Sequence, residues 1–342
     1  MNIVMWKKAL TVIPNVTKEE WDELDLISKW LIASRAAVLI MTFLSAILAG
    51  LFAWHDHISF KLTDWLILTI GLIFAHAANN LFNDYTDYSR GVDKDNYFRT
   101  MYGPQPIADG LMTRKQHIRY FLATGSIAMI CGIYLMVNNG LDPNKLLLLG
   151  LGAFFVLFYT WPLKYLALGE VSVLLVWGPL MIGGGYYVLT NSWSWNVIIA
   201  SLPYVLGVTA VIFGKHIDKI EVDKAKKIFT LPVVIGEKAG RLLLTILMAI
   251  PYLLVLIMII LKYFTPLLLL VFLALPTLIK LLPQLRNPRP ESKPEGFPEG
   301  QGGWPLFFAP IAFVNNRSFG LWFMLGLILD VIVRLLVPLF WI

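Results

Sequence analysis

Long apolar runs alternate with short polar segments along almost the whole chain. Runs without Asp, Glu, Lys or Arg cover residues 36–55, 65–83, 120–141, 146–163, 171–214, 242–261, 263–279 and 318–329. The run 171–214 is long enough for two membrane helices with a break at Thr190-Asn191-Ser192, and the last run stays largely apolar to Ile342. Because a helix needs roughly 20 apolar residues to cross a bilayer, the pattern predicts an all-α, polytopic membrane protein with about nine transmembrane helices.

The composition agrees with this pattern and excludes two other classes of protein. Hydrophobic residues make up 58% of the 342 residues, charged residues 15%, and the mean hydropathy is +0.69. Soluble domains carry about 25% charged residues. The net charge of +6 does not indicate nucleic-acid binding, because such proteins gather basic residues on a polar face. We therefore expect a lipid bilayer and no nucleic acid as partner, and no feature specifies an oligomeric state.

The basic residues predict how the chain is oriented. If the apolar runs are membrane spans, 24 of the 28 Lys and Arg residues fall on the side of the N-terminus. Cytoplasmic loops carry such an excess, so we predict a multi-pass protein of the cell membrane with a cytoplasmic N-terminus. The first 25 residues have no apolar core, so no cleavable signal peptide is expected. We predict a cytoplasmic segment 1–25, one transmembrane domain 26–342, and a flexible Pro/Gly-rich loop at 286–303.

The first of two acidic clusters follows the second predicted span, in the run Asn79-Asn80-Leu81-Phe82-Asn83-Asp84-Tyr85-Thr86-Asp87. If the helix continues, Asn80, Asp84 and Asp87 share one face because they are spaced four and three residues apart. Like-charged carboxylates at this distance repel one another, and a bound cation relieves the repulsion. Oxygen ligands favour a hard ion such as Mg²⁺.

The second acidic cluster ends the sixth predicted span and contains Asp218, Glu221 and Asp223. Asp218 and Glu221 share a helix face, and Asp223 joins them only if the helix ends or kinks there. One acidic run at a membrane surface is usually a solvated loop. Two runs on the same predicted side favour a site, and the polar His76 and Asn79 within the second span strengthen it, since polar groups in a membrane are costly.

Two Mg²⁺-binding acidic clusters suit chemistry on a diphosphate, because metal ions neutralise the charge of such a leaving group. Basic side chains near the acids would add charge-assisted contacts to the phosphate oxygens; the candidates are Lys94, Arg99, Lys215 and Lys224. A membrane enzyme that acts on a diphosphate suits a polyprenyl diphosphate, whose tail prefers lipid. The deeper Asp330 lies four residues before Arg334, so the two are expected to pair.

The first cluster resembles the Asn-Asp-x-x-Asp signature of the UbiA superfamily of intramembrane prenyltransferases. The run Thr230-Leu231-Pro232-Val233-Val234-Ile235-Gly236 after the second cluster is similar to that family's "TLxxxxG" sequence. Ser34-Arg35 resembles its first-span arginine. The resemblance covers roughly residues 30–245 and implies helices bundled around a central cavity with a cytoplasmic acidic face.

Within the superfamily, the chain most resembles 1,4-dihydroxy-2-naphthoate polyprenyltransferases of menaquinone biosynthesis. The runs that carry this likeness are Asn83-Asp84-Tyr85-x-Asp87-Tyr88-x-x-Gly91-x-Asp93, Phe158-Tyr159-Thr160-x-Pro162, Leu168-Gly169-Glu170 and Gly183-Gly184-Gly185-Tyr186-Tyr187. The chain departs from the pattern at Lys219, where many relatives carry an acid, and at Asp218, which is displaced by one residue. Gln105 also stands where many relatives carry arginine.

The resemblance implies a set of roles. Asn80, Asp84 and Asp87 would hold one Mg²⁺, and Glu221 and Asp223, with or without Asp218, another; Asp84, Asp87 and Asp223 would be catalytic. The expected substrate-binding residues are Arg35, Lys94, Arg99, Tyr159, Lys215, Lys219 and Lys224. The implied reaction is transfer of a polyprenyl group from its diphosphate to a small aromatic acceptor.

Two kinds of alternative remain open from the sequence. The first keeps the superfamily and changes the acceptor to 4-hydroxybenzoate, homogentisate or a sugar phosphate, or replaces transfer by terpene cyclisation. The second is a membrane transporter, whose typical sign is acids or broken helices at the bilayer midplane. Here the clustered acids lie at the ends of spans, which favours the enzyme.

Overall fold

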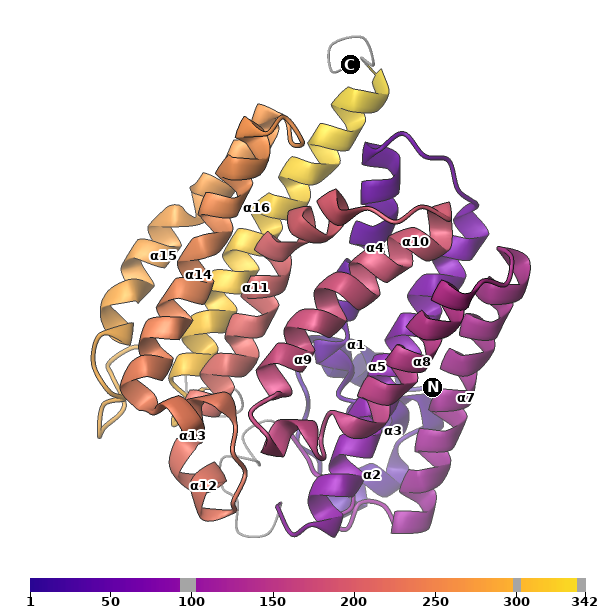
Figure 1. Cartoon of the computed structure of the whole chain (residues 1–342). Helices are drawn as coiled ribbons and strands as arrows, with labels where there is room; N and C mark the ends of the chain where they lie inside the picture. Colours follow the sequence, from indigo (N-terminus) through magenta and orange to yellow (C-terminus); the bar gives the residue numbers. More distant parts are fainter. Residues whose placement is uncertain (93–102, 298–302, 337–342) are drawn as a thin grey trace.

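The computed structural model describes residues 1–92, 103–297 and 303–336. Within them every regular element is a helix (Figure 1). The elements are α1 (Ile3–Thr11), α2 (Lys18–Glu23), α3 (Leu26–Ala33), η1 (Ala36–Val38), α4 (Ile40–His55), α5 (Leu62–Ser89), α7 (Arg114–Asn138), α8 (Pro143–Phe158), η2 (Leu163–Tyr165), α9 (Gly169–Leu175), η3 (Val176–Gly183), α10 (Gly184–Thr190), α11 (Trp195–Asp218), α12 (Ile220–Ala225), α13 (Leu231–Ile235), α14 (Glu237–Ile260), η4 (Pro266–Ala274), α15 (Leu275–Leu281), η5 (Leu282–Leu285) and α16 (Phe308–Leu336).

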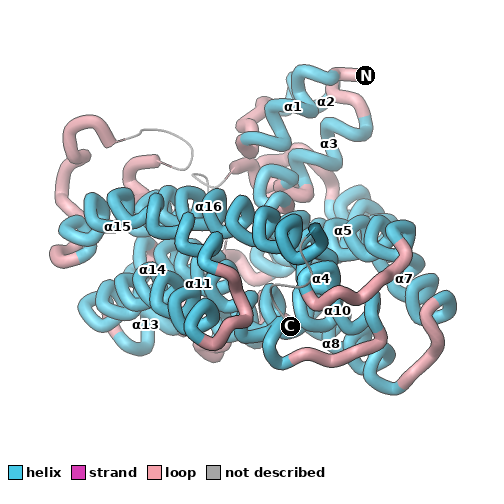
Figure 2. Tube along the Cα trace, turned by 90° about the horizontal axis from the view of Figure 1, so that it is seen from above, coloured by secondary structure: helices cyan, strands magenta, loops and turns pink. Residues whose placement is uncertain are grey.

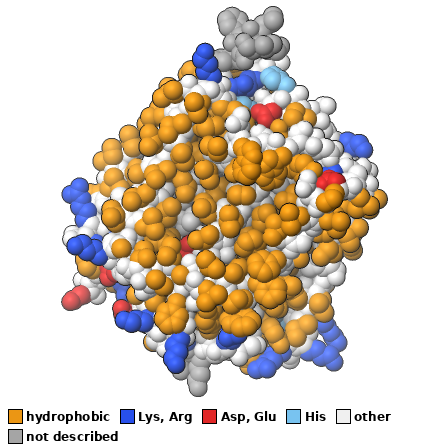
Figure 3. Space-filling model, in the orientation of Figure 1, with side chains coloured by type: hydrophobic (Ala, Val, Ile, Leu, Met, Phe, Trp, Pro, Cys, Tyr) orange, Lys and Arg blue, Asp and Glu red, His pale blue; other side chains and the backbone are white. Residues whose placement is uncertain are grey.

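The long helices confirm a polytopic membrane protein. In the described part of the chain, eight helical stretches are long and apolar enough to cross a bilayer: Ala36–His55, Leu62–Ser89, Arg114–Asn138, Gly169–Thr190, Trp195–Asp218, Glu237–Ile260, Pro266–Leu285 and Phe308–Leu336. The fourth predicted span, 146–163, is the shorter apolar helix α8, which ends at Phe158 before the turn at Pro162. A broad band of hydrophobic side chains covers the face seen in Figure 3, with many charged side chains toward its edges.

Polar residues at the polar–apolar boundaries set where several helices begin. Thr113 and Gln116 form a capping box at the start of α7. The Asp142 side chain accepts the backbone N–H groups of Asn144 and Lys145 at the start of α8. Ser194 caps α11 in the same way. These side chains satisfy N–H groups that have no partner within the helix. The sequence break at 190–192 thus becomes the turn between α10 and α11.

The helices pack into two neighbouring groups (Figures 1 and 2). In one, α5 packs against α7, α8 and α4; in the other, α11 packs against α14 and α16. The largest buried cluster joins α4, η3 and α10 to α11, α14 and α16 and contains Phe52, Tyr204, Phe213, Phe264 and Phe323. Removing such large apolar side chains would leave cavities, so this cluster fixes the relative positions of the two groups.

The N-terminal segment also folds onto the bundle. Trp21 and Leu24 are buried with Leu31 against Leu81 of α5 and Leu111. Asp25 caps α3 and accepts the indole N–H of Trp6 at 3.1 Å. Hydrogen bonds from the Ser28 and Asn2 backbone lower the pKa of the Asp25 carboxyl below its usual value. The segment is therefore anchored beside the polar ends of α5 and α7.

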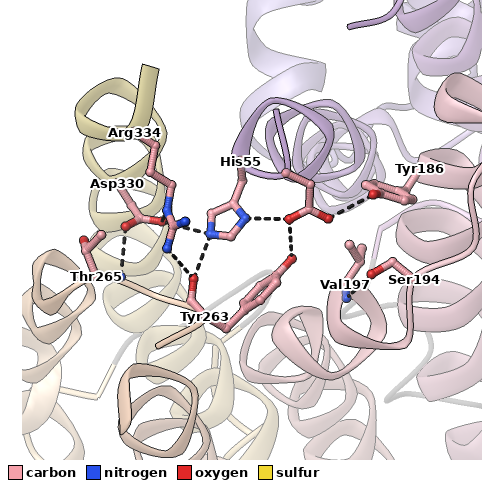
Figure 4. Close-up of polar contacts among 9 residues, drawn as sticks. His55, Tyr186, Ser194, Val197, Tyr263, Thr265, Asp330 and Arg334 are labelled. Atoms are coloured by element: carbon pink, nitrogen blue, oxygen red, sulfur yellow. Dashed lines mark hydrogen bonds and ion pairs between the residues drawn. The ribbon is translucent and has the colours of Figure 1, made fainter. Parts of the chain in front are cut away.

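A network of polar side chains joins the opposite ends of the helices (Figure 4). We call it the far-end network, and its members are His55, Asp56, Tyr186, Tyr263, Thr265, Asp330 and Arg334. His55 lies between Asp56, with Nδ1 to Oδ1 at 2.8 Å, and Asp330, with Nε2 to Oδ2 at 3.2 Å. Arg334 Nε lies 3.3 Å from Asp330 Oδ2, which confirms the pair expected from their spacing. The network ties α4 and α10 to α16.

Candidate active site

A cavity of about 390 Å³ lies among α4, α5, α8, η3, α11 and the start of α16. Along α5 its lining changes from Leu72 to Asn79 and Asn83, and along α11 from Val208 to Lys215, with Lys219 directly after the end of the helix. Its cationic lining residues are Arg35, Lys164, Lys215 and Lys219. No Asp or Glu of the described chain lines it. The cavity is therefore apolar toward the interior of the bundle and cationic toward the ends of α5 and α11.

The first acidic cluster stands on α5, which continues as a helix to Ser89. Asn80, Asp84 and Asp87 are 7%, 2% and 1% exposed, so the predicted shared face is a buried one. The Asn80 amide donates to the backbone oxygen of Ser34 at 2.9 Å, which leaves its carbonyl oxygen as the end for a ligand.

Arg35 holds Asp84 from the side of the cavity. The residue directly precedes η1 and lies in the left-handed backbone region, with φ 56°, which is uncommon for a residue other than glycine. Its guanidinium binds the Asp84 carboxylate and donates to Gln105 Oε1 at 3.3 Å. Gln105, noted in the sequence as a departure from the family, thus belongs to the surroundings of the first acidic cluster.

Lys164 holds Asp87 in the way that Arg35 holds Asp84. The sequence did not predict Lys164 as a site residue. Its ammonium lies 3.0 and 3.2 Å from the two carboxylate oxygens of Asp87. The residue sits in the short turn between α8 and α9. Its only signal in the sequence was that it is the single basic residue of that connection.

The second acidic cluster divides into residues with different surroundings. Asp218 is the last residue of α11, and its carboxylate accepts the N–H groups of Phe307, Phe308 and Ala309 at 2.9–3.0 Å. These groups lie at the start of α16, where an anion is favoured by the free N–H donors and the helix dipole. The Asp218 carboxylate thus caps the N-terminus of α16, which argues against its predicted role as a metal ligand.

Asp223, on α12, is 1% exposed. Its Oδ1 accepts from Lys219 Nζ at 3.1 Å, and its Oδ2 is buried with no hydrogen-bond partner in the described part of the chain. Glu221 and Lys224 are exposed on the same short helix and do not line the cavity. The predicted convergence of Asp218, Glu221 and Asp223 is therefore not observed.

The remaining predicted residues fall into two sets. Tyr159, Lys215 and Lys219 all line the cavity. Lys94 and Arg99 lie outside the described residues. Three of the cavity cations thus each hold one acid of the motifs: Arg35 holds Asp84, Lys164 holds Asp87 and Lys219 holds Asp223.

Another buried pair of side chains lies at the cavity, and the sequence had assigned neither residue a role. His216, on α11, lines the cavity, and its Nδ1 lies 2.6 Å from Glu170 Oε1 on α9. Glu170 is 3% exposed. His216 follows Lys215 directly in the chain, but its carboxylate partner comes from a distant segment.

The donor set fits a hard cation. Carboxylate and amide oxygens of Asn80, Asp84, Asp87 and Asp223 are the ligands that Mg²⁺ prefers, and the buried Asp223 Oδ2 lacks a partner in the described chain. No three His, Cys, Asp or Glu side chains of the described residues lie close enough to hold one ion by themselves. Mg²⁺ is commonly bound by one or two carboxylates together with substrate phosphates, so a site completed by substrate agrees with this arrangement.

Comparison with known sequences gives one family and several relatives. The profile of the UbiA prenyltransferase family matches residues 42–297. UbiA prenyltransferase domain-containing protein 1 of Rattus norvegicus is 27% identical over 188 residues, 54% of each chain. Its homolog in Drosophila melanogaster is 25% identical over 226 residues, 64% of this chain and 60% of the relative. The alignments span little more than half the length of these curated relatives, and neither name specifies a naphthoate acceptor.

Solved structures show the same fold. An apo UbiA homolog from Aeropyrum pernix K1 aligns with a TM-score of 0.60 at 16% identity, over 85% of this chain and 96% of that one. A UbiA homolog from Archaeoglobus fulgidus bound to GPP and Mg²⁺ aligns with a TM-score of 0.53 at 14% identity, over 87% and 99%. At this identity the likeness concerns the fold alone.

Proposed function

The chain belongs to the UbiA prenyltransferase family, and from its cavity we propose that it transfers a polyprenyl group from a polyprenyl diphosphate to an aromatic acceptor. The acceptor we propose is a quinone precursor such as 1,4-dihydroxy-2-naphthoate. The observation that carries the proposal is the cavity itself, with four cations at one end and mainly apolar side chains along the rest. Such a lining suits an amphiphilic anion.

The cations are placed to bind the diphosphate. Arg35, Lys164, Lys215 and Lys219 line one end of the cavity, and charge-assisted hydrogen bonds to phosphate are about twice as strong as neutral ones. The acids behind three of them hold these long side chains in position. We propose that the prenyl tail lies against the apolar lining, which includes Leu72, Leu148 and Leu180.

The same side chains would promote the bond cleavage. The allylic C–O bond breaks with its electron pair on the diphosphate, and fixed cations stabilise the charge that develops there. Tyr159 and Trp177 line the cavity, and their ring faces can stabilise the allylic cation. Apolar walls keep water from that cation. The acceptor ring then forms the C–C bond and loses a proton, or carbon dioxide if the attacked carbon carries a carboxylate.

We propose that Asn80, Asp84, Asp87 and Asp223 hold Mg²⁺ when the diphosphate is present. The metal would neutralise charge on the diphosphate. Asp218 is left out because it caps α16, and Glu221 because it is exposed. We further propose that this end of the bundle faces the cytoplasm, since most Lys and Arg residues lie on its side.

The test is transfer by purified protein in lipid nanodiscs. A polyprenyl diphosphate is incubated with 1,4-dihydroxy-2-naphthoate, 4-hydroxybenzoate or homogentisate, in Mg²⁺ or in EDTA, and products are identified by mass spectrometry. We expect a prenylated naphthoate product in Mg²⁺ alone. Prenylation of another acceptor only would replace the proposed acceptor, and binding of the diphosphate without any product would contradict transfer to an aromatic ring.

A further inference from the structure

The pair formed by Glu170 and His216 is built into the frame of the cavity. Glu170 Oε1 lies 2.6 Å from His216 Nδ1, and its Oε2 accepts the N–H of Leu231 at 3.4 Å. The carboxylate therefore bridges α9, α11 and the start of α13. Both side chains are 3% exposed, and a buried charged group kept in this way needs a reason beyond packing.

The contact with Glu170 fixes which nitrogen of His216 carries hydrogen. A carboxylate only accepts hydrogen bonds, so Nδ1 must be the protonated nitrogen. Nε2, on the other edge of the ring, makes no hydrogen bond with the described residues. Lys215 and Lys219, which are close to His216 in the chain, line the same cavity. With its hydrogen on Nδ1, the neutral imidazole offers Nε2 as a hydrogen-bond acceptor, whereas the charged lining groups of the cavity, Arg35, Lys164, Lys215 and Lys219, are donors.

The other histidine of the cavity differs in this respect. His76 Nδ1 lies 2.7 Å from the Thr42 hydroxyl, which can donate or accept. Its tautomer is therefore not fixed by a partner, although it lines the same cavity. Of the two cavity histidines, only His216 thus has a partner that fixes its tautomer, and its Nε2 can accept a hydrogen bond from a hydroxyl group.

We propose that His216, positioned by Glu170, binds the hydroxyl group of the acceptor, and that this contact selects hydroxylated aromatic rings. This rests on the proposed function for the presence of an aromatic acceptor. His216 lies on α11 beside the lysines of the cationic end, so a ring held there is next to the diphosphate and the allylic carbon it must attack. A hydroxyl that donates to Nε2 also makes the ring richer in electrons.

The test compares a hydroxylated naphthoate with its methyl ether, which cannot donate a hydrogen bond. Dissociation constants of both probes are measured on detergent-purified full-length protein with prenyl diphosphate and Mg²⁺ present. The wild-type protein should bind the hydroxyl probe about 10- to 100-fold more tightly. His216→Phe should abolish this preference, and Glu170→Gln should weaken it, because an amide can also donate to Nδ1 and so reverse the tautomer. His76→Phe, the matched cavity imidazole, should keep the wild-type ratio.

Thermal unfolding of each variant reports whether it is folded, and the affinity for prenyl diphosphate is measured on the same samples. Equal binding of the two probes, or binding of neither, by the wild-type protein would overturn the inference, and transfer activity in that sample would leave the proposed function standing. A His216→Phe protein that keeps the probe ratio but binds prenyl diphosphate more weakly would show that His216 contacts the diphosphate instead. If Glu170→Gln retains the full ratio, the fixed tautomer is not the cause.

Discussion

Two buried ionic clusters lie at opposite ends of the bundle, and they differ in what lies next to them. At the acidic end, Arg35, Lys164 and Lys219 hold the acids of the sequence motifs and also line a cavity. In the far-end network, Asp330 is fully buried, and no member of the network lines the cavity. The charged side chains of the far-end network contact one another and form hydrogen bonds with backbone groups, such as the Tyr263 carbonyl and the Thr265 N–H.

Because only one of the two clusters lies beside the cavity, we expect the two to serve different purposes, the acidic end activity and the far-end network stability. A charge beside a cavity can exchange its partner for a ligand or for water, so breaking an ion pair there leaves no stranded charge. A charge enclosed by protein has no such alternative, and removing its partner is strongly destabilising. We therefore expect substitutions at the acidic end to reduce activity and substitutions in the far-end network to reduce stability.

The largest effect is expected for Asp84→Asn. We expect kcat to fall by about a thousandfold or more, because the variant weakens both the metal site and the position of Arg35 next to the leaving group. The melting temperature should change little, since water in the cavity can solvate Arg35. Asp64→Asn is the matched control: Asp64 is a buried aspartate on the same helix, bonded to Asn138 at 2.9 Å, and its variant should remain active. An Asp84→Asn protein with unchanged Mg²⁺-dependent transfer would contradict the proposed mechanism.

For Asp330→Asn we expect the converse, a loss of about 3–5 kcal/mol in the free energy of unfolding, with activity per folded molecule retained. The physical reason is that His55 and Arg334 would be left enclosed without their shared carboxylate. Thermal unfolding in detergent measures the loss. The double variant Asp330→Asn/Arg334→Gln should lose less than the sum of the two single variants. Additive losses would show that these charges do not depend on one another.

Lys164→Gln should have a smaller effect, a rise of about 10- to 100-fold in KM for prenyl diphosphate. The variant removes one cation from the lining, while Arg35, Lys215 and Lys219 remain. Steady-state kinetics at saturating acceptor measure the change, with the exposed Lys115→Gln as the control for lost positive charge. An unchanged KM would mean that Lys164 positions Asp87 and does not bind the diphosphate.

The smallest effect is expected for Glu221→Gln, a change within about twofold in kcat, as for other exposed positions. Asp223→Asn on the same helix should instead approach the loss seen for Asp84→Asn, because Asp223 is buried against Lys219. Transfer assays on the two variants side by side make the comparison. A large loss of kcat in Glu221→Gln would indicate that Glu221 is a Mg²⁺ ligand after all.

The α5 residues illustrate what could be predicted from local sequence. The helical period placed Asn80, Asp84 and Asp87 on one face, and the structure has them there because the helix continues to Ser89. The second cluster could not be predicted in the same way. The end of α11 at Asp218 turns that acid toward the N–H groups of α16, about ninety residues later in the chain, and such a partner leaves no local pattern.

The sequence by itself determined the class of the protein, since runs of apolar residues long enough to cross a bilayer have no stable place in water. It also determined the two acidic motifs and the likeness to a family. Only the tertiary structure decided which charges meet: Lys164 with Asp87, Glu170 with His216, and Asp330 with His55. The physical reason is that helical periodicity relates residues three or four apart, whereas an ion pair forms wherever packing brings two side chains within a few ångströms.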